Sequence, residues 1–174
     1  RGLGDVYKRQ DQGHKFREEV KERINSVKLR LENKNRPKIL TIEWIDPIYI
    51  GGMWLPEMID IVGGEVCLAE SGKKAPVVSR EDLEKIEPDV VVVKPCGYKL
   101  DQTLKELELL KQQMPVWKKL PRIYLVDGNS YFNRPGPRIL DSLEILAYCT
   151  YPDLFSEFGK RYKKDLIELG PGLQ

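Results

Sequence analysis

The sequence lacks several of the residues from which common catalytic and metal sites are built. His14 is its only histidine and lies far upstream of the apolar runs. A nucleophile at the end of one of those runs would therefore have no histidine to act as its base. The three cysteines, Cys67, Cys96 and Cys149, are odd in number and form no CxxC pair. This pattern favours neither a disulfide scaffold nor a zinc site. No apolar run approaches the roughly 20 residues of a membrane-spanning helix.

Positive charge is scarce where a nucleic-acid surface would need it. The formal net charge is +2, but residues 1–36 hold 11 Lys and Arg against 6 Asp and Glu. The remainder is therefore mildly acidic, and no basic patch interleaved with aromatic residues appears in it. We expect no nucleic-acid partner.

The first residues show no secretory signal, because Arg1 to Gln10 contain no apolar core and no small-residue cleavage site. The chain also starts without Met, and this stretch has the look of a translated adapter sequence. We expect residues 1–14 to be an artefact or a disordered terminus, and we expect an N-terminal part of the protein to be missing.

A long helix is predicted over Lys15 to Asn33. Five apolar residues recur at helical spacing along it, namely Phe16, Val20, Ile24, Val27 and Leu31. At about 1.5 Å per residue such a helix is nearly 30 Å long, the width of a small domain. It would either lie along a globular domain or bridge two of them.

From Lys38 onward, four apolar runs alternate with four helical patterns. The predicted strands are Ile39–Trp44, Val66–Ala69, Val90–Val93 and Ile123–Val126, and the predicted helices are Trp54–Val62, Ser79–Ile86, Asp101–Gln113 and Arg138–Tyr148. Near-continuous Val and Ile runs are typical of strands buried on both faces. We therefore predict an α/β class: a three-layer α/β/α, Rossmann-like lobe over residues 36–152 with a parallel sheet of about four strands, followed by a C-terminal helix or tail over residues 153–174.

Local signals refine two of the helix starts and the tail. Ser79, with Asp82 three residues on, predicts an approximate capping box. Pro137 is predicted at the first position of the helix that follows. Leu154, Phe155, Phe158, Leu166 and Ile167 are loosely spaced as in a terminal helix.

Ligand-binding residues are expected where the parallel strands end, because their carboxyl ends meet at one edge of the sheet. The candidates there are Trp44, Asp46, Trp54, Cys96 and Tyr98, with Asn129, Tyr131, Phe132, Asn133 and Arg134 from the loop Asp127–Arg138. An edge this rich in aromatic residues predicts a large, flat, mostly apolar ligand. Core packing is the alternative reading for Trp44, and a half-buried structural thiol for Cys96. No metal site and no nucleotide-binding motif is predicted.

Several motifs resemble a known family. They are Glu43-Trp44-Ile45-Asp46-Pro47, Gly52-Met53-Trp54-Leu55-Pro56-Glu57, Lys94-Pro95-Cys96-Gly97-Tyr98 and the loop Asp127–Arg138 with its Asp-Gly-Asn-Ser-Tyr-Phe start. Together they resemble the cobalamin-binding, BtuF-like substrate-binding proteins of ABC transporters, in the helical-backbone metal receptor group. The match runs in order from about Lys15 to Pro152.

The resemblance implies a non-enzymatic receptor with two lobes joined by a long helix. Residues 15–35 would be that helix, and the lobe that follows would be the C-terminal one. Cobalamin, a ligand and not a catalytic cofactor, would lie against the aromatic residues, with Asn129, Asn133 and Arg134 meeting its amides. Glu57 is the candidate for docking on the permease.

The resemblance also implies a periplasmic or extracytoplasmic location and a monomer when full length, with no insertion into the membrane. A cytoplasmic corrinoid-binding role stays open. The same scaffold with haem or a ferric siderophore is an alternative. An α/β enzyme that uses Cys96 with a carboxylate such as Asp127 is another.

Overall fold

Seven strands form one mixed sheet within residues 3–171, which this computed structural model describes, with side chains described from residue 10. The strands are β1 (Lys38–Trp44), β2 (Ile48–Ile50), β3 (Glu65–Val66), β4 (Val77–Val78), β5 (Val90–Val93), β6 (Arg122–Val126) and β7 (Leu166–Pro171). Their order is β4-β2-β1-β5-β6-β7, and β3 pairs with β1 beside β2.

The four predicted strands are confirmed as β1, β3, β5 and β6, and they are parallel to one another. Ile39 is in register with Val90, and Val90 with Arg122. The predicted number of strands was too small, because three further strands pair antiparallel with their neighbours. Two of them, β2 and β4, have only two or three residues and are too short to show a periodic pattern.

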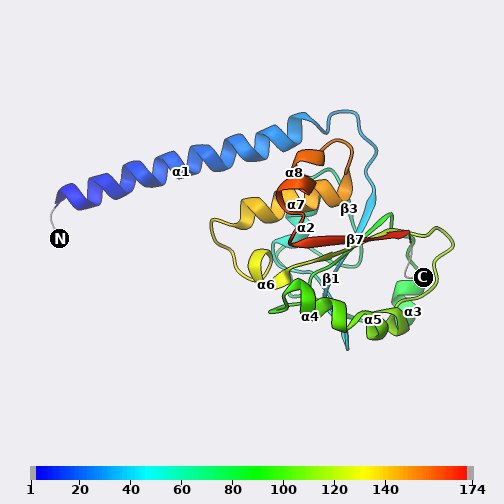
Figure 1. Ribbon diagram of the computed structural model, residues 1–174. Helices are drawn as coiled ribbons and strands as arrows, with labels where there is room; N and C mark the ends of the chain where they lie inside the picture. The colour runs from blue at the N-terminus through cyan, green and yellow to red at the C-terminus, as the bar shows by residue number, and fades with distance from the viewer. Residues whose placement is uncertain (1–2, 172–174) are drawn as a thin grey trace.

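Two helical layers cover the sheet, which confirms the three-layer α/β/α arrangement (Figure 1). The helices after α1 are α2 (Leu55–Ile61), α3 (Arg80–Glu84), α4 (Leu100–Lys105), α5 (Leu107–Gln113), α6 (Gly128–Tyr131), α7 (Ile139–Thr150) and α8 (Ser156–Arg161). Along β5, Val90 and Val92 face the core under α2, α7 and α8, while Val91 and Val93 face the core under α3 and α5. Burial on both faces explains the unbroken valine run.

Helix α1 (Leu3–Leu29) lies partly on the lobe and partly beyond it (Figure 1). Its C-terminal half packs on the lobe through Val27, which is 1% exposed. Its N-terminal half projects past the side of the lobe on which α6 lies. The helix starts at Leu3, well before the predicted Lys15. The interpretation of residues 1–14 as foreign sequence stays a prediction.

Three local predictions are corrected by the structure. The predicted helix over 101–113 is interrupted at Glu106, which ends α4 and precedes α5. Pro137 lies before the helix, because α7 starts at Ile139 with Arg138 as its N-cap. Over residues 153–171, the described part of the predicted tail, α8 is the helix, and the apolar residues Leu166 and Ile167 instead pair with β6 as strand β7. The capping box of Ser79 and Asp82 is confirmed.

Candidate functional site

The carboxyl ends of β1, β5 and β6 lie together at one edge of the sheet, as the parallel pairing requires. Trp44 ends β1, and Tyr98 lies in the loop after β5. Their rings meet edge to face with centroids 5.2 Å apart and planes at 72°. The Trp44 indole N–H donates to the Asp46 carbonyl oxygen at 3.0 Å, which fixes the indole where β1 turns toward β2. The sequence placed these three residues together correctly.

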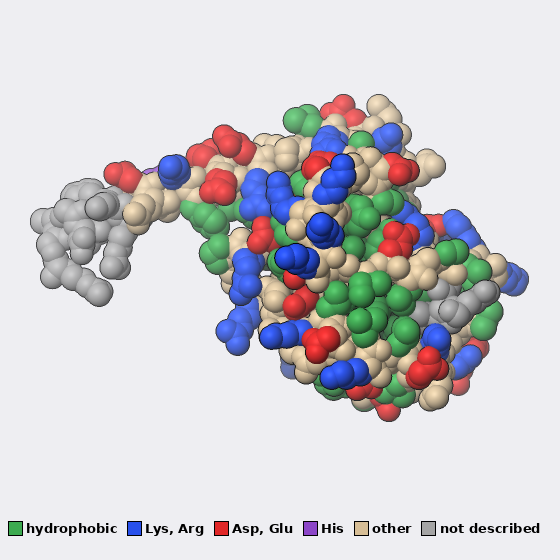
Figure 2. Space-filling model, viewed as in Figure 1, with side chains coloured by type: hydrophobic (Ala, Val, Ile, Leu, Met, Phe, Trp, Pro, Cys, Tyr) green, Lys and Arg blue, Asp and Glu red, His purple; other side chains and the backbone are tan. Residues whose placement is uncertain are grey.

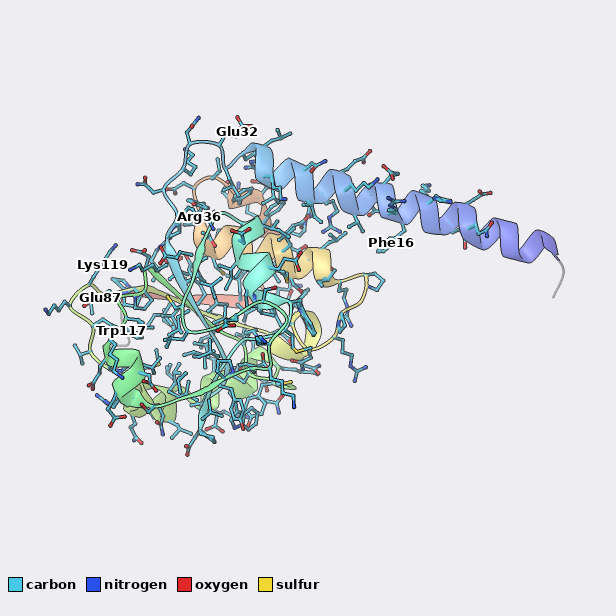
Figure 3. All side chains as sticks on the ribbon, turned by 180° about the vertical axis from the view of Figure 1, so that it is seen from behind. Phe16, Glu32, Arg36, Glu87, Trp117 and Lys119 are labelled. Atoms are coloured by element: carbon cyan, nitrogen blue, oxygen red, sulfur yellow. The ribbon has the colours of Figure 1, made fainter. Side chains whose placement is uncertain are left out.

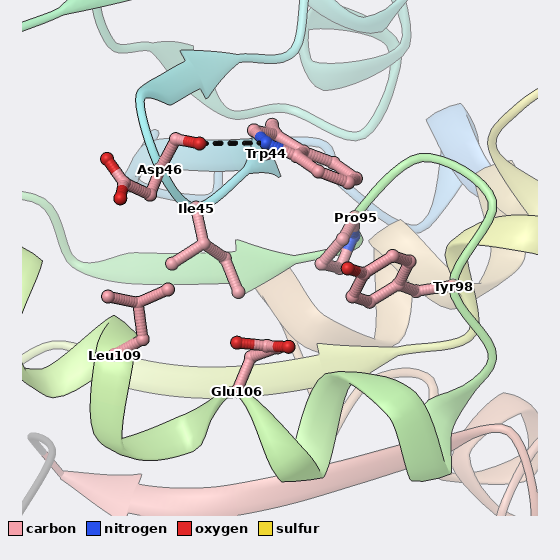
Figure 4. A pocket seen from close by; sticks show the side chains of 7 residues that line it. All are labelled: Trp44, Ile45, Asp46, Pro95, Tyr98, Glu106 and Leu109. Carbon is pink, nitrogen blue, oxygen red and sulfur yellow. Dashed lines mark hydrogen bonds between the residues drawn. The ribbon is translucent and has the colours of Figure 1, made fainter.

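A hollow of about 80 Å³ lies beside this aromatic pair (Figure 4). Its lining residues are Trp44, Ile45, Asp46, Pro95, Tyr98, Glu106 and Leu109. Sites that enclose a whole drug-sized ligand usually measure about 300–1,000 Å³. The hollow therefore has room for part of a large ligand, and the remainder would extend over the edge.

Sequence reasoning missed Glu106 and Leu109. Both come from the helical segment between β5 and β6, which packs beside the edge, and the interruption at Glu106 is marked by neither Pro nor Gly. Glu106 has an intermediate exposure, and its carboxylate points into the hollow (Figure 4). The one feature of the sequence that could have pointed to Glu106 is its position, one to two turns into the helix that follows the end of a strand.

The loop after β6 is held tightly against the loop after β5. The backbone N–H of Asn129 donates to the Tyr98 carbonyl at 3.0 Å. The side-chain amide of Asn133, oriented to satisfy both of its groups, donates to the Gly128 carbonyl at 3.0 Å and accepts from the Gly97 N–H. A Cβ at Gly128 would lie 2.2 Å from the Pro95 carbonyl oxygen, so the two loops approach as closely as glycine permits.

Asp127 is a structural residue of this loop. Its carboxylate accepts hydrogen bonds from the Ser130 backbone N–H at 2.7 Å and from the Ser130 hydroxyl at 3.0 Å. These bonds cap α6, a short helix inside the segment that the sequence predicted as a loop. The carboxylate is thus already engaged in holding the backbone.

The two aromatic residues of the loop point inward. Phe132 is 3% exposed and belongs to the core under α7. Tyr131 is half-buried, donates through its hydroxyl to the Asp165 carboxylate at 3.0 Å, and packs edge to face on Tyr162 at 5.7 Å. Burial, together with the hydrogen bond to Asp165, raises the pKa of Tyr131 to about 12. Both side chains support the loop from beneath.

An ion pair between a buried lysine and a half-buried glutamate lies beside the edge. Lys94 follows β5 and is 1% exposed, and its Nζ contacts Glu43 Oε2 at 3.1 Å. Burial lowers the pKa of Lys94, and the Glu43 carboxylate opposes that shift. The Phe132 ring lies 5.8 Å from Nζ. Neither partner was predicted as a ligand-binding residue. Lys94 was missed because an apolar run gives no sign that the residue after it stays buried, and Glu43 because it lies inside the predicted strand Ile39–Trp44.

The segment Gly51–Trp54 lies further from the edge than the sequence suggested. Strand β2 runs back along β1, so the Gly51 N–H donates to the Thr41 carbonyl at 2.9 Å, well inside the sheet. Trp54 is half-buried and packs on the core shared by α1, α2 and α7. Met53 is 48% exposed.

The remaining candidates are accessible. Asp46, Cys96, Asn129 and Arg134 are exposed near the edge, and Glu57 is exposed in the first turn of α2. Within residues 3–171, no cluster of three or more His, Cys, Asp or Glu has the arrangement of a metal site. The helices of the same residues include none that is both long and apolar enough to cross a membrane.

Comparisons with known proteins agree on the type of molecule. A family model described as "Periplasmic binding protein" matches residues 1–123. The high-affinity heme uptake system protein IsdE of Staphylococcus aureus is 26% identical over 124 residues, which is 67% of this chain and 41% of that protein. The chain thus spans well under two thirds of this relative.

Solved structures share the fold. An ABC transporter substrate-binding protein from Listeria monocytogenes superposes with a TM-score of 0.65 at 15% identity, over 86% of this chain and 61% of that one. A periplasmic heme binding protein from Pseudomonas aeruginosa gives a TM-score of 0.63 at 17% identity, over 86% and 57%. At these identities the likeness establishes the fold alone.

Proposed function

The chain belongs to the periplasmic binding protein family, and from this premise we propose that it is one lobe and the connecting helix of a receptor that delivers cobalamin or a related corrinoid to an ABC importer. Members of the family bind substrates and are not enzymes, so the alternative of an enzyme that uses Cys96 is set aside. The proposed location is extracytoplasmic, the proposed partner is a permease, and the full-length receptor is proposed to be a monomer.

The observation that carries the proposal is the aromatic pair of Trp44 and Tyr98 at a rigid edge. Aromatic rings in such a position offer a large apolar contact to a flat ligand at low cost in side-chain entropy. The loops that hold them are tied by backbone hydrogen bonds and by the close approach at Gly128. Such an edge is preorganised, which reduces the entropic cost of binding.

Helix α1 supports a two-lobe receptor. Its projecting half extends on the side where α6 and the carboxyl ends of the strands lie (Figure 1). Phe16, 42% exposed, lies on that half beyond the lobe (Figure 3). On the face seen in Figure 2, the coloured part of the projecting half carries charged side chains of both signs beside some hydrophobic ones. A second lobe carried by this half would face the edge and enclose the ligand.

The anchor of α1 makes this arrangement stiff. Arg23 Nη2 contacts Asp141 Oδ1 at 2.9 Å and Glu144 Oε1 at 2.8 Å. Glu144, 5% exposed, also contacts Arg161 at 2.6 Å and accepts from the Tyr162 hydroxyl at 2.7 Å. With α1 fixed to α7 in this way, we expect capture with little hinge motion between lobes.

The proposed contacts follow the exposed side chains. Trp44 and Tyr98 would meet the corrin face, with Asp46 and Cys96 nearby, and the amides would meet Asn129 and Arg134. Trp54, which packs on the core away from this edge, would meet only a part of the ligand that extends beyond it. Tyr131, Phe132 and Asn133 would act by holding the loop. Glu57 is proposed to dock on the permease, and Glu81, exposed in the first turn of α3, offers a matched acidic residue for comparison.

Haem is the second candidate ligand. It is favoured by the printed names of IsdE and of the Pseudomonas aeruginosa structure, both of which refer to heme. For haem, as for a corrinoid, the edge offers aromatic rings and amide groups, and Arg134 adds a positively charged side chain.

Titration of the purified chain with cyanocobalamin and aquocobalamin, beside haem and a ferric siderophore, tests the proposal through the absorption bands of each ligand and the heat of binding. Selective binding of the two corrinoids is the expected result. Binding of haem with no response to either corrinoid would overturn the cobalamin assignment and support the second candidate.

A further inference from the structure

The hollow beside Trp44 combines apolar walls with one carboxylate that points into it and a second one at its margin. Glu106 points into it from the junction of α4 and α5, and Asp46 lies at its margin (Figure 4). Ile45, Pro95 and Leu109 supply apolar surface. No Lys, Arg or His is among the described residues that line it.

The two carboxylates are not neutralised by the protein. Among the residues whose side chains the structure describes, neither the Asp46 nor the Glu106 carboxylate makes a hydrogen bond or an ion pair. Glu43, at the end of the same β1 strand, differs because Lys94 Nζ lies 3.1 Å from it. An ionised carboxylate only accepts hydrogen bonds, so the hollow offers acceptors and negative charge. The donor side chains that line it are the Tyr98 hydroxyl and the Trp44 indole N–H, and the indole N–H is already bonded to the Asp46 carbonyl.

The size of the hollow limits its occupant to one small group. Its volume is about 80 Å³, well below the roughly 300–1,000 Å³ of sites that enclose a whole ligand. A few non-hydrogen atoms fill such a space. A macrocycle lying over Trp44 and Tyr98 would therefore insert one peripheral arm.

We propose that this hollow receives a primary-amide arm of a corrinoid and that Asp46 and Glu106 exclude ligands that place a carboxylate there. The inference rests on the proposed function and deepens it. An amide arm donates an N–H group to the Glu106 carboxylate and lays its methylene groups against Ile45, Pro95 and Leu109, while Asp46 adds negative charge at the margin. A propionate arm, as in haem, would bring a third negative charge into a partly desolvated space, so selectivity arises from repulsion as well as attraction.

The test compares cyanocobalamin with its monocarboxylic acids, in which one amide arm is hydrolysed, for binding to the 174-residue chain. In the wild type, we expect the regioisomer whose acid occupies the hollow to bind about tenfold more weakly than the parent, as for like charges in contact at a partly exposed site. Glu106→Gln and the double variant with Asp46→Asn should reduce this ratio to about threefold or less. Because the ratio is taken within one protein, a general loss of affinity cancels.

Glu108→Gln is the matched control, since Glu108 lies on α5 with a side chain that is 79% exposed. It should leave the ratio at its wild-type value. Equal affinity of the wild type for the parent and every monocarboxylic acid, or a ratio that Glu106→Gln does not change, would overturn the inference while the proposed function stands. Failure of every corrinoid to bind would overturn both.

Discussion

The indole ring of Trp44 and the phenol ring of Tyr98 meet edge to face at 5.2 Å, although 54 positions separate them in the sequence. The pair exists because β1 and β5 are adjacent and parallel, so the residues after both strands reach the same edge. Each ring holds the other in place, and the indole is fixed further by the Asp46 carbonyl. Removal of either ring should therefore loosen the position of the other.

Tyr98→Ala should weaken corrinoid binding about thirtyfold, because it removes one aromatic contact and frees the Trp44 ring, each worth ~1 kcal/mol. Tyr98→Phe keeps the ring and should retain most of the affinity. Calorimetric titration measures both. Equal affinities of the alanine variant and the wild type would show that the pair does not contact the ligand.

Gly128→Ala should lower the free energy of unfolding by ~2 kcal/mol or more, because the new Cβ would lie 2.2 Å from the Pro95 carbonyl oxygen and 2.7 Å from that of Lys94. Gly136→Ala in the same loop is the control, since nothing lies within 4 Å of its Cβ position. Urea unfolding of both variants measures their free energies of unfolding and tests this difference. Equal stability of the two variants would mean that the loops are not in close contact.

Arg23→Ala should lower stability by ~1–2 kcal/mol, because Glu144 is almost completely buried and keeps only Arg161 and Tyr162 as partners. The estimate is below that for a fully buried pair, since the Arg23 side chain is 27% exposed. Lys21→Ala removes only an exposed pair with Glu18 and should change stability by less than ~0.5 kcal/mol. Hydrogen exchange should show faster exchange in α1 of the Arg23 variant alone.

Glu43→Ala should cost more stability than Lys94→Met, by ~1 kcal/mol or more. Loss of Glu43 leaves a buried ammonium group without its partner, whereas loss of Lys94 leaves a carboxylate whose side chain is 30% exposed to water. Urea unfolding of the two variants and of the double variant gives the coupling energy. A larger loss for Lys94→Met would contradict the burial of this lysine.

Alkaline pH should destabilise the protein in part through Tyr131. Its pKa in the folded protein is raised from the usual 10 to about 12, so the unfolded chain loses the phenolic proton first. Its contribution is complete below pH 10 and is lost as the pH rises from 10 to about 12. Tyr131→Phe should therefore show a shallower fall of unfolding free energy over this range. An unchanged slope would contradict a raised pKa for this residue.

The central strands and the edge were predictable because they depend on local patterns. Short, largely apolar runs identified β1, β5 and β6, and parallel pairing then brought Trp44 and Tyr98 together. The segment that forms strand β7 was predicted to be helical, because its few apolar residues adopt a strand conformation only through pairing with β6.

The less visible parts of the site depend on contacts between distant segments. Glu106 enters the hollow because of a helix interruption that no Pro or Gly marks, and Lys94 is buried because Glu43 lies beside it. The inward direction of Phe132 follows from the packing of α7 on the sheet. Such effects become visible only when the tertiary structure is known.

The indole N–H signals of the three tryptophans provide the most direct measurement of the central claim. Trp44 lies at the edge, whereas Trp117 is 6% exposed, donates to the Leu83 carbonyl, and lies on the far side of the lobe from the projecting half of α1 (Figure 3). On titration of the nitrogen-15-labelled chain with cyanocobalamin, the Trp44 signal should shift or broaden while the Trp117 signal stays unchanged. A Trp44 signal that does not respond, or one that responds no more than that of Trp117, would contradict binding at this edge.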